Sequence, residues 1–330
     1  MIISKTPLRI SFFGGGTDYP DHVSKYGGAV LSTSINKYVY LTVNRISEIS
    51  QHKYKVTYSK LEHGQSIDEL LHPSVRECLR FMGIEEGIEI HTMSDLPAQT
   101  GLGSSSSFTV GLLNALYAYK GKMIPNLKLA HEAIYVEQKL IGEKVGLQDQ
   151  CAAAVGGLNY FEFKQDGSIT YKPVIMAEDR KKTFKNNLML FYTGVQRFAE
   201  DVIKVQIENI QKGRVTKDLD HIREMVDKGV SILTTDTDLS EFGTLLHDAW
   251  VAKKSLSTSI SNSFLDNIYD KAMNAGALGG KLLGAGGGGF FLFYADLSQQ
   301  EKVRQALKDY QEISFDFDKE GSNNIFVYEN

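Results

Sequence analysis

Residues 96–108 form a run of small residues, Leu-Pro-Ala-Gln-Thr-Gly-Leu-Gly-Ser-Ser-Ser-Ser-Phe, that leads directly into a helical pattern. Beyond this run, apolar side chains recur at spacings of four, four and three, which places them on one face of a helix: Phe108, Leu112, Leu116 and Tyr119. Ser104 or Ser105 can cap the start of this helix, and Gly121 can end it. The pattern therefore predicts a small-residue loop that opens onto a helix N-terminus.

A loop of this kind is suited to hold phosphate. Backbone N–H groups at a helix start have no helical partner and carry the positive end of the helix dipole, so they favour anions. Small residues permit close approach, and a serine hydroxyl could bind Mg²⁺. A serine N-cap is the alternative, but a cap needs one serine and this loop has four. The predicted phosphate-binding residues are Pro97, Gly101, Leu102, Gly103, Ser104, Ser105, Ser106 and Ser107.

Another glycine-rich segment ends a β-prone run near the start of the chain. It reads Arg-Ile-Ser-Phe-Phe-Gly-Gly-Gly-Thr-Asp-Tyr-Pro from Arg9 to Pro20. Glycines let a backbone approach a ligand closely, and an acidic side chain just beyond them can accept hydrogen bonds from sugar hydroxyls. A tight turn capped by Asp18 explains the same residues equally well. The candidate substrate-binding residues here are Gly14, Gly15, Gly16, Thr17 and Asp18.

The third glycine-rich segment, residues 279–293, contains a literal G-x-G-x-x-G at Gly284, Gly286 and Gly289. A dinucleotide-binding fingerprint requires a strand before it and a helix after it, whereas an apolar strand follows here. We therefore reject a Rossmann site. We expect this loop to pack its backbone against the phosphate loop, with Gly286 and Gly287 near the substrate. A structural bend in a sheet is the alternative interpretation.

Missing motifs narrow the enzyme class. The sequence has no G-x-x-x-x-G-K-[ST], so it is not a P-loop enzyme, and it has neither His-Arg-Asp nor Asp-Phe-Gly, so it is not a protein kinase. A balance of 36 basic against 40 acidic residues, with no long run of either sign, gives no support for a nucleic-acid or membrane partner. Without a signal-like start or a long apolar stretch, the expected location is the cytoplasm.

The chain of 330 residues suggests two domains of an α+β class. Helices are expected at about 104–120, 127–141 and 150–155, and over much of 197–275. We place the domain boundary in the charged stretch near residues 180–187, giving domains of 1–183 and 184–330. The predicted strands are Ile2-Ile3, Leu8–Phe13, Ala29–Ser32, Tyr38–Val43, Ile88–Thr92, Leu158–Phe163, Ile169–Ile175, Leu188–Tyr192, Phe290–Tyr294 and Asn324–Tyr328.

In this order, the three glycine-rich segments resemble those of the GHMP kinases. The family's middle motif, Pro-x-x-x-Gly-Leu-Gly-Ser-Ser, is matched by Pro97 and by residues 101–105. The resemblance implies an N-terminal α/β domain and a ferredoxin-like C-terminal domain. It further implies that ATP, bound through the phosphate loop, and a small-molecule substrate share the cleft between these domains. Mg²⁺ is the implied metal cofactor.

The resemblance also implies roles for three charged residues. Glu137 stands where a family glutamate helps the loop serine to hold Mg²⁺, and Asp149 stands where an aspartate acts as base or electrostatic partner of the acceptor hydroxyl. Arg9 aligns with an arginine near that base. By local pattern alone, Glu137 and Arg9 would be solvated charges, and Asp149 would be a helix cap. Between Ser104 and Ser105, we assign Ser105 to the metal.

Within the family, the first segment is similar to the D-glycero-D-manno-heptose 7-phosphate kinases and is related to the fucokinase pattern. Arg197 and Lys253-Lys254 also resemble that subgroup, and a basic residue there could hold the phosphate that the substrate already carries. The implied reaction is phosphorylation of the anomeric hydroxyl to the 1,7-bisphosphate. A fucokinase-like or other free-sugar kinase and a non-catalytic sugar and ATP sensor are the alternatives.

Overall fold

Two long antiparallel strands, β1 (Ile2–Phe13) and β2 (Gly28–Arg45), form the centre of the first domain. The computed structural model describes residues 1–196 and 199–328. The short strands predicted in this region are parts of β1 and β2. Their pairing shifts register after Pro7 and again after Ser11. Polar side chains such as that of Thr6 are fully buried within β1, so alternation of apolar and polar residues does not reveal the full strand.

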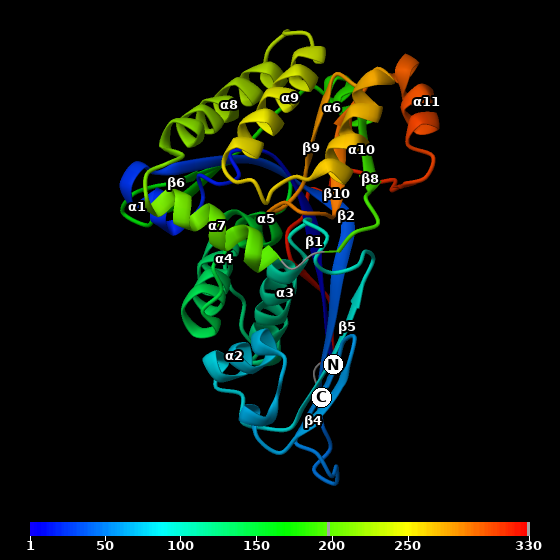
Figure 1. Cartoon of the computed structure of the whole chain (residues 1–330). Coiled ribbons are helices and arrows are strands. Elements are labelled where there is room, and N and C mark those ends of the chain that lie inside the picture. The colour runs from blue at the N-terminus through cyan, green and yellow to red at the C-terminus, as the bar shows by residue number, and fades with distance from the viewer. Residues whose placement is uncertain (197–198, 329–330) are drawn as a thin grey trace.

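In the described residues, these strands belong to an eight-stranded sheet whose main path runs β12-β1-β2-β5-β3-β4. The strand β6 pairs with β2 and with β7. Because β12 pairs with β1, the end of the chain returns to the sheet in which the chain begins (Figure 1). The other strands are β3 (Tyr54–Thr57), β4 (Leu61–Gly64), β5 (Ile88–Ser94), β6 (Leu158–Phe163), β7 (Ile169–Pro173) and β12 (Asn323–Val327).

A group of helices packs beside this sheet, and α3 lies against β1 and β2 (Figure 1). The 3₁₀ turn η1 (Ile67–Glu69) precedes them, and α1 (Pro20–Tyr26) follows the first glycine-rich segment. The segment η2 continues α4 with π-helical geometry. The helices of the group are α2 (Pro73–Met82), α3 (Ser104–Tyr119), α4 (Asn126–Tyr135), η2 (Val136–Ile141) and α5 (Gln148–Val155).

The start of α3 differs from the prediction. Its N-cap residue is Gly103, with a φ of 76° in the left-handed region, and no side chain caps the helix. The predicted serine cap is therefore wrong. Ser106 and Ser107 instead donate hydrogen bonds to Glu137 and to the carbonyl of Pro7. At the other end, a glycine at φ 65°, Gly121, follows the helix as predicted.

The second domain contains a four-stranded antiparallel sheet in the described residues, in the order β11-β8-β10-β9. Along the chain the order is strand, helices, strand, strand, helix, strand, which is the ferredoxin-like arrangement that the resemblance implied. Its elements are β8 (Leu188–Tyr192), α7 (Ala199–Gln211), α8 (Thr216–Thr234), α9 (Ser240–Ser255), α10 (Ser263–Asn274), β9 (Gly279–Leu282), β10 (Phe290–Tyr294), α11 (Leu297–Ala306) and β11 (Gln311–Glu312).

The connection between the domains is a helix. The charged stretch chosen for the boundary forms α6 (Glu178–Asn186), which spans the predicted division at residue 183. Since β12 pairs with β1, residues near the end of the chain pack with the first sheet. The exact division into 1–183 and 184–330 stays a prediction.

Aromatic side chains join the two domains. Phe12 of β1 lies 5.4 Å from Phe242 of α9, measured between ring centroids, and Phe184 of α6 lies 4.6 Å from Phe242. All three are fully buried. Edge-to-face contacts of this kind add to the free energy of apolar burial. This apolar junction holds the second domain against the end of β1, where the first glycine-rich segment begins.

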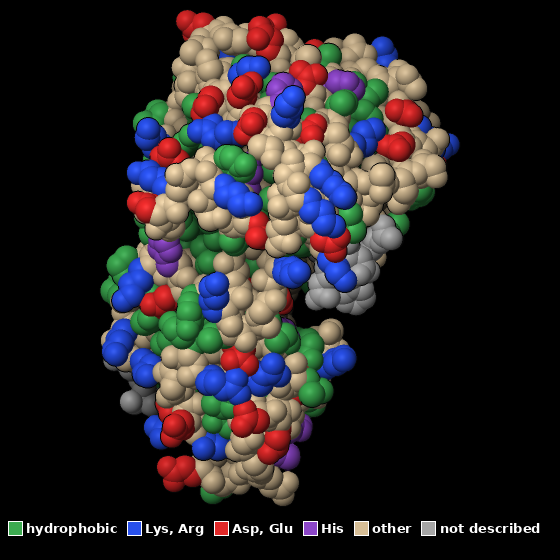
Figure 2. All heavy atoms as spheres, turned by 60° about the vertical axis from the view of Figure 1, so that its left-hand side comes forward, with side chains coloured by type: hydrophobic (Ala, Val, Ile, Leu, Met, Phe, Trp, Pro, Cys, Tyr) green, Lys and Arg blue, Asp and Glu red, His purple; other side chains and the backbone are tan. Residues whose placement is uncertain are grey.

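The described surface fits the near-neutral charge of the sequence. Basic and acidic side chains are intermixed over the face seen in Figure 2, which shows no large area of a single sign. Within residues 1–196 and 199–328, no helix has the length and apolar character needed to cross a membrane.

Candidate active site

A cavity of about 910 Å³ lies where the two domains meet, and residues from all three glycine-rich segments line it. Small-molecule sites commonly have volumes of roughly 300–1,000 Å³. The predicted site residues on its wall are Arg9, Gly15, Gly16, Asp18, Pro97, Gly101, Gly103, Ser104, Ser105, Ser106, Asp149 and Gly286. Other predicted residues do not line it: Gly14, Thr17, Leu102, Ser107, Glu137 and Gly287. Arg197 lies outside the residues that the structure describes.

Arg9 and Asp149 form an ion pair with two hydrogen bonds. Arg9 Nε donates to Asp149 Oδ1 at 2.7 Å, and Nη2 donates to Oδ2 at 2.9 Å. The third guanidinium nitrogen, Nη1, donates to the carbonyl of Gly101 in the phosphate loop at 2.7 Å. The Arg9 side chain is 4% exposed, whereas that of Asp149 is 28% exposed and reaches the cavity. A bidentate pair of this type fixes both position and orientation of the carboxylate.

Gly103 brings the phosphate loop directly over this ion pair. A Cβ atom at Gly103 would lie 3.2 Å from Arg9 Cγ and 3.5 Å from Asp149 Cγ. Its left-handed φ of 76° also favours glycine. The first turn of α3 then presents the N–H groups of Ser104–Ser106, which have no carbonyl partner within the helix. An anion held by these groups would lie next to the Asp149 carboxylate.

Glu137 lies behind the loop, on the π-helical turn η2, and is fully buried. Its Oε2 accepts hydrogen bonds from Ser106 Oγ, at 3.0 Å, and from Gln150 Nε2. Its Oε1 forms no hydrogen bond of ordinary geometry among the described residues, although the Thr109 hydroxyl is close enough to lower the pKa of the carboxyl group. Burial raises the pKa of Glu137 to about 7. A buried carboxylate oxygen without a partner requires a further positive charge or donor.

These residues fit a magnesium ion that phosphate oxygens help to hold. Mg²⁺ is often bound by one or two carboxylates together with substrate phosphates and water. No group of three or more His, Cys, Asp or Glu side chains suited to a metal occurs in the described part of the chain. The candidate donors among the predicted residues are Glu137 and a serine hydroxyl. The hydrogen bond from Ser106 to Glu137 favours Ser106 as the serine beside the metal. Ser105 is exposed, and its assignment to the metal stays a prediction.

Asp18 connects the first glycine-rich segment to the start of α5. It is 2% exposed, and its carboxylate accepts from the N–H groups of Gly16, Leu147 and Gln148 at 3.0 to 3.2 Å. A Cβ at Gly146 would lie 2.0 Å from Asp18 Oδ2. Burial raises the pKa of Asp18, and the nearby Asp149 raises it further. This arrangement matches the capping interpretation of Asp18, and contact with a substrate stays a prediction.

Gly14 and Thr17 shape the turn behind this wall. Gly14 has a φ of 91°, and a Cβ there would lie 1.9 Å from the carbonyl oxygen of Ala29. Thr17 Oγ1 donates to the carbonyls of Gly14 and Ala29. These two residues therefore support the turn at which Gly15 and Gly16 line the cavity.

The third glycine-rich segment packs backbone to backbone against the phosphate loop, as the sequence predicts. A Cβ at Gly101 would lie 2.3 Å from the carbonyl oxygen of Leu283, and a Cβ at Gly284 would lie 2.5 Å from Gly101 Cα. Gly287 donates its N–H to the carbonyl of Ile260. The absence of side chains at Gly101 and Gly284 thus lets the two domains meet at the phosphate loop.

Two lysines on the second-domain side of the cavity were not assigned from the sequence: Lys253 of α9 had only an open interpretation, and Lys281 of β9 was missed. Lys253 Nζ donates to the carbonyls of Leu282 and Gly284, and Lys281 Nζ donates to the carbonyl of Phe12 at 2.7 Å. The signal that could have found Lys281 is a lone basic residue inside a strand of glycine and leucine.

The electrostatics of these lysines follow from their burial. Both are less than 10% exposed. Burial, followed by the field of Arg9, lowers the pKa of Lys253 to about 8, although Asp18 and Asp149 oppose this shift. Burial, followed by the fields of Lys253 and Arg9, places the pKa of Lys281 well below its usual value. Arg9, Lys253 and Lys281 therefore act electrostatically on one another.

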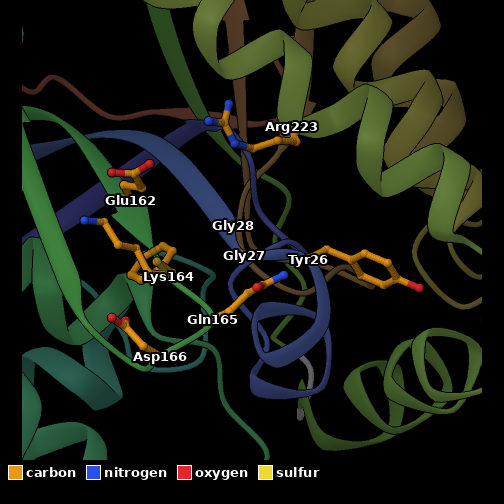
Figure 3. A pocket seen from close by; sticks show the side chains of 9 residues that line it. Tyr26, Gly27, Gly28, Glu162, Lys164, Gln165, Asp166 and Arg223 are labelled. Carbon is orange, nitrogen blue, oxygen red and sulfur yellow. The ribbon is translucent and has the colours of Figure 1, made fainter.

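Another cavity, of about 430 Å³, lies between the β6–β7 hairpin and α8. Figure 3 shows Glu162, Lys164 and Asp166 coming from the hairpin side and Arg223 from the helix. Arg223 is already paired, because it donates to Asp227 at 2.9 Å and to the Tyr160 hydroxyl at 2.7 Å. The phosphate loop and Asp149 do not line this cavity, so we assign the chemistry to the larger one.

Two protein-family models match the chain, one in each half. The model described as GHMP kinases N terminal domain matches residues 70–157, and that described as GHMP kinases C terminal matches residues 231–313. The first match includes the phosphate loop and Asp149, and the second includes Lys253 and Lys281.

Known proteins align along nearly the whole chain. A D-glycero-alpha-D-manno-heptose 7-phosphate kinase of Campylobacter jejuni is 29% identical, over 97% of each chain. A galactokinase of Pyrococcus furiosus is 25% identical, over 93% of this chain and 92% of its own. The crystal structure of a D-glycero-D-manno-heptose 1-phosphate kinase from Bacteroides thetaiotaomicron is 26% identical, with a TM-score of 0.81 over 100% of both chains. Because both family domains match in chain order, this protein belongs to the GHMP kinases and is a phosphotransferase that acts on an alcohol group.

Proposed function

We propose that this protein transfers the γ-phosphoryl group of ATP to the anomeric hydroxyl of D-glycero-D-manno-heptose 7-phosphate. The observation that carries the proposal is the position of Asp149, which Arg9 holds in a bidentate ion pair directly beside Gly103 of the phosphate loop. A carboxylate there can meet the acceptor hydroxyl while the start of α3 holds the donor phosphates. Phosphoryl transfer depends mainly on such positioning and on charge stabilisation.

The cavity residues that belong to the first domain form what we call the first-domain wall. Three parts of it have distinct roles in this proposal: the start of α3, Asp149 and Arg9. The N–H groups of Ser104–Ser106 bind phosphate oxygens of ATP. Asp149 orients the acceptor hydroxyl and accepts its proton as the bond to phosphorus forms. Arg9 keeps the carboxylate in place, and its positive charge offsets the negative charge that develops on the transferred group.

Mg²⁺ is the metal that the family implies, and Glu137 with Ser106 would hold it. The chemistry that it would supply there is neutralisation of phosphate charge. The unpartnered Oε1 of Glu137 supports this assignment. Ser105, which the motif match selects, is exposed and is the alternative hydroxyl.

The heptose assignment rests on the names of related proteins and on the first glycine-rich segment. One relative is named a heptose 7-phosphate kinase, and the protein with a related crystal structure is named a heptose 1-phosphate kinase. Both names describe a heptose that already bears a phosphate, at different positions. The 7-phosphate is our choice because Asp149 would then act on the free anomeric hydroxyl. Gly15, Gly16 and Asp18 lie on the wall beside it.

An ADP-release assay over a panel of acceptors tests this proposal. The panel contains heptose 7-phosphate, heptose 1-phosphate, galactose, fucose, mannose, homoserine and mevalonate. We expect kcat/KM to be highest for heptose 7-phosphate, by about 10- to 150-fold over the free sugars, because a lost hydrogen bond to a charged donor costs about 1.5–3 kcal/mol. A preference for free fucose or galactose would contradict the heptose assignment. Sugar and ATP binding without ADP release would favour the sensor.

A further inference from the structure

Lys253 and Lys281, which form the charged part of the second-domain wall of the cavity, have no carboxylate in direct contact, although Asp18 and Asp149 lie near enough to Lys253 to influence its pKa. In the residues that the structure describes, neither Lys253 nor Lys281 forms an ion pair, and their hydrogen-bond acceptors are backbone carbonyls. Their neighbour Lys254 differs, because it is partly exposed and pairs with Asp266 at 3.3 Å. A buried ammonium without an opposite charge is costly, and native structures usually pair such a charge or use it to bind a ligand.

One more polar side chain of the cavity is unsatisfied, and it belongs to β1 of the first domain. Ser11 is 5% exposed, lines the cavity, and its Oγ has no hydrogen-bond partner in the described residues. An ammonium group carries three donors, of which the described bonds use one at Lys281 and two at Lys253. Two cations and a free hydroxyl on a cavity wall form a site for a multiply charged anion.

We propose that Lys253 and Lys281 bind the phosphate that the acceptor already carries, an assignment that rests on the proposed function. In the proposed function, the nucleotide phosphates bind to the N–H groups at the start of α3 in the first domain, and Glu137 would hold the metal. The lysines belong to α9 and β9 of the second domain and line the same cavity as Asp149. A phosphate monoester carries about −1.5 to −2 charges at pH 7, which matches two ammonium groups.

This binding site would determine which sugars are accepted. A phosphorylated acceptor brings the charge that Lys253 and Lys281 lack, while a free sugar leaves both ammonium groups without an anion. The selectivity therefore comes from second-domain residues, not from the phosphate loop. Arg197, to which the sequence also assigned this role, lies outside the described residues, and its assignment stays a prediction.

Substitution of each lysine by methionine tests the assignment, because methionine has a similar length and no charge. In Lys253→Met, we expect kcat/KM for heptose 7-phosphate to fall by about 10- to 150-fold. The value for unphosphorylated D-glycero-D-manno-heptose and the KM for ATP should change by less than about threefold. Lys228→Met is the control, since it removes the same charge from an exposed residue of α8 that does not line the cavity and should leave both acceptors unchanged.

Equal losses for both acceptors, or a raised KM for ATP, would overturn the proposal and assign the lysines to the transferred phosphoryl group. Lys253→Arg should retain the preference for the phosphorylated sugar, which separates loss of charge from a local packing defect. Both methionine variants also lose hydrogen bonds to backbone carbonyls, two at Lys253 and one at Lys281, so the difference between the two acceptors, and not the total activity, decides the test.

A binding experiment separates this proposal from the heptose assignment. Calorimetry with the unmodified protein would measure the affinities of heptose 7-phosphate, mannose 6-phosphate, fructose 1-phosphate and inorganic phosphate. If another sugar phosphate binds and Lys253→Met weakens it at least about tenfold, the phosphate site stands although the heptose assignment fails. If Lys253→Met binds every phosphate as tightly as the unmodified protein, the phosphate site is wrong whatever the acceptor.

Discussion

The two walls of the large cavity differ in how their charges are balanced. On the first-domain wall, Arg9 and Asp149 neutralise each other. On the second-domain wall, Lys253 and Lys281 have carbonyl partners but no described carboxylate. The first arrangement is complete without a ligand and can keep its geometry in the free protein. The second gains its missing charge only on binding, so we expect it to contribute selectivity and the first to contribute catalysis.

A similar contrast exists between the two aspartates of the first-domain wall. Asp18 is 2% exposed, and three backbone N–H groups donate to its carboxylate. Asp149 is 28% exposed and takes its hydrogen bonds from Arg9 alone among the described side chains. Asp18 fixes the start of α5, and that helix carries Asp149. The structural and the chemical task therefore fall to different carboxylates.

The largest expected effect comes from blocking the loop over the ion pair. In Gly103→Val, the branched side chain would enter the space beside Arg9 Cγ at 3.2 Å and would also strain a left-handed backbone. We expect no detectable ATP binding by calorimetry. Gly142→Val is the matched control, because Gly142 has a φ of 84° with nothing within 4 Å of its Cβ position. Tight ATP binding by Gly103→Val would disprove the phosphate-loop assignment.

The next effect tests the chemical role of the first-domain wall. Asp149→Asn should lower kcat by at least about 100-fold, the lower range for a positioned acid–base group, while ATP still binds. The melting temperature should also fall, because Arg9 is 3% exposed and loses its counter-charge. Rates are therefore compared well below the transition. Asp166→Asn, in the other cavity, is the control.

Near-normal turnover by folded Asp149→Asn would remove this residue from the mechanism. Loss of ATP binding together with turnover would instead assign the Arg9–Asp149 pair to loop structure. Either result would weaken the distinction between a catalytic wall and a selective wall.

Local sequence patterns predicted compact elements well. The strands β6, β8 and β10 have the predicted bounds, since β8 and β10 are short apolar runs and β6 is rich in aromatic residues directly after two glycines. The long strands β1 and β2 were predicted in pieces, because both carry buried polar residues. For β1, the pairing of Thr6 with Ser322, across 316 residues, satisfies a hydroxyl that a local pattern would place outside.

The candidate site shows the same limit. Family resemblance singled out Arg9 and Asp149, which the structure brings into contact across 140 residues. The helical phase of α3 decides that Ser106, and not its neighbour, faces Glu137, and a row of four identical residues cannot reveal that phase. Lys281 depends on a contact with Phe12 that spans 269 residues. Such pairings exist only in the folded chain.

A smaller effect distinguishes the two serines at the metal site. Ser106→Ala removes the hydroxyl beside Glu137, so the Mg²⁺ concentration for half-maximal rate should rise about tenfold. Ser105→Ala, its matched control, should leave this concentration unchanged. Calorimetric titration of ATP with and without Mg²⁺ gives a second readout. If Ser105→Ala raises this Mg²⁺ concentration and Ser106→Ala does not, Ser105 is the ligand. If neither variant changes it, another group holds the metal.

The smallest effect is a pH dependence confined to the second-domain wall. The pKa of Lys253 is lowered to about 8 by burial and by Arg9, against the opposing fields of Asp18 and Asp149, and Lys281 lies nearby. The ammonium is the form that binds an anion, and it is the dominant form below its pKa. Above pH 8 the free protein therefore loses this charge, and binding of a phosphorylated acceptor must restore the proton.

We expect the KM of the phosphorylated acceptor to rise by up to about tenfold per pH unit above 8, while the KM of a free sugar stays nearly constant. A steady-state pH series with both acceptors measures the difference, and Lys253→Met should abolish it. A parallel rise for both sugars would mean that the titrating group belongs to the shared catalytic wall, and the comparison between the two walls would fail.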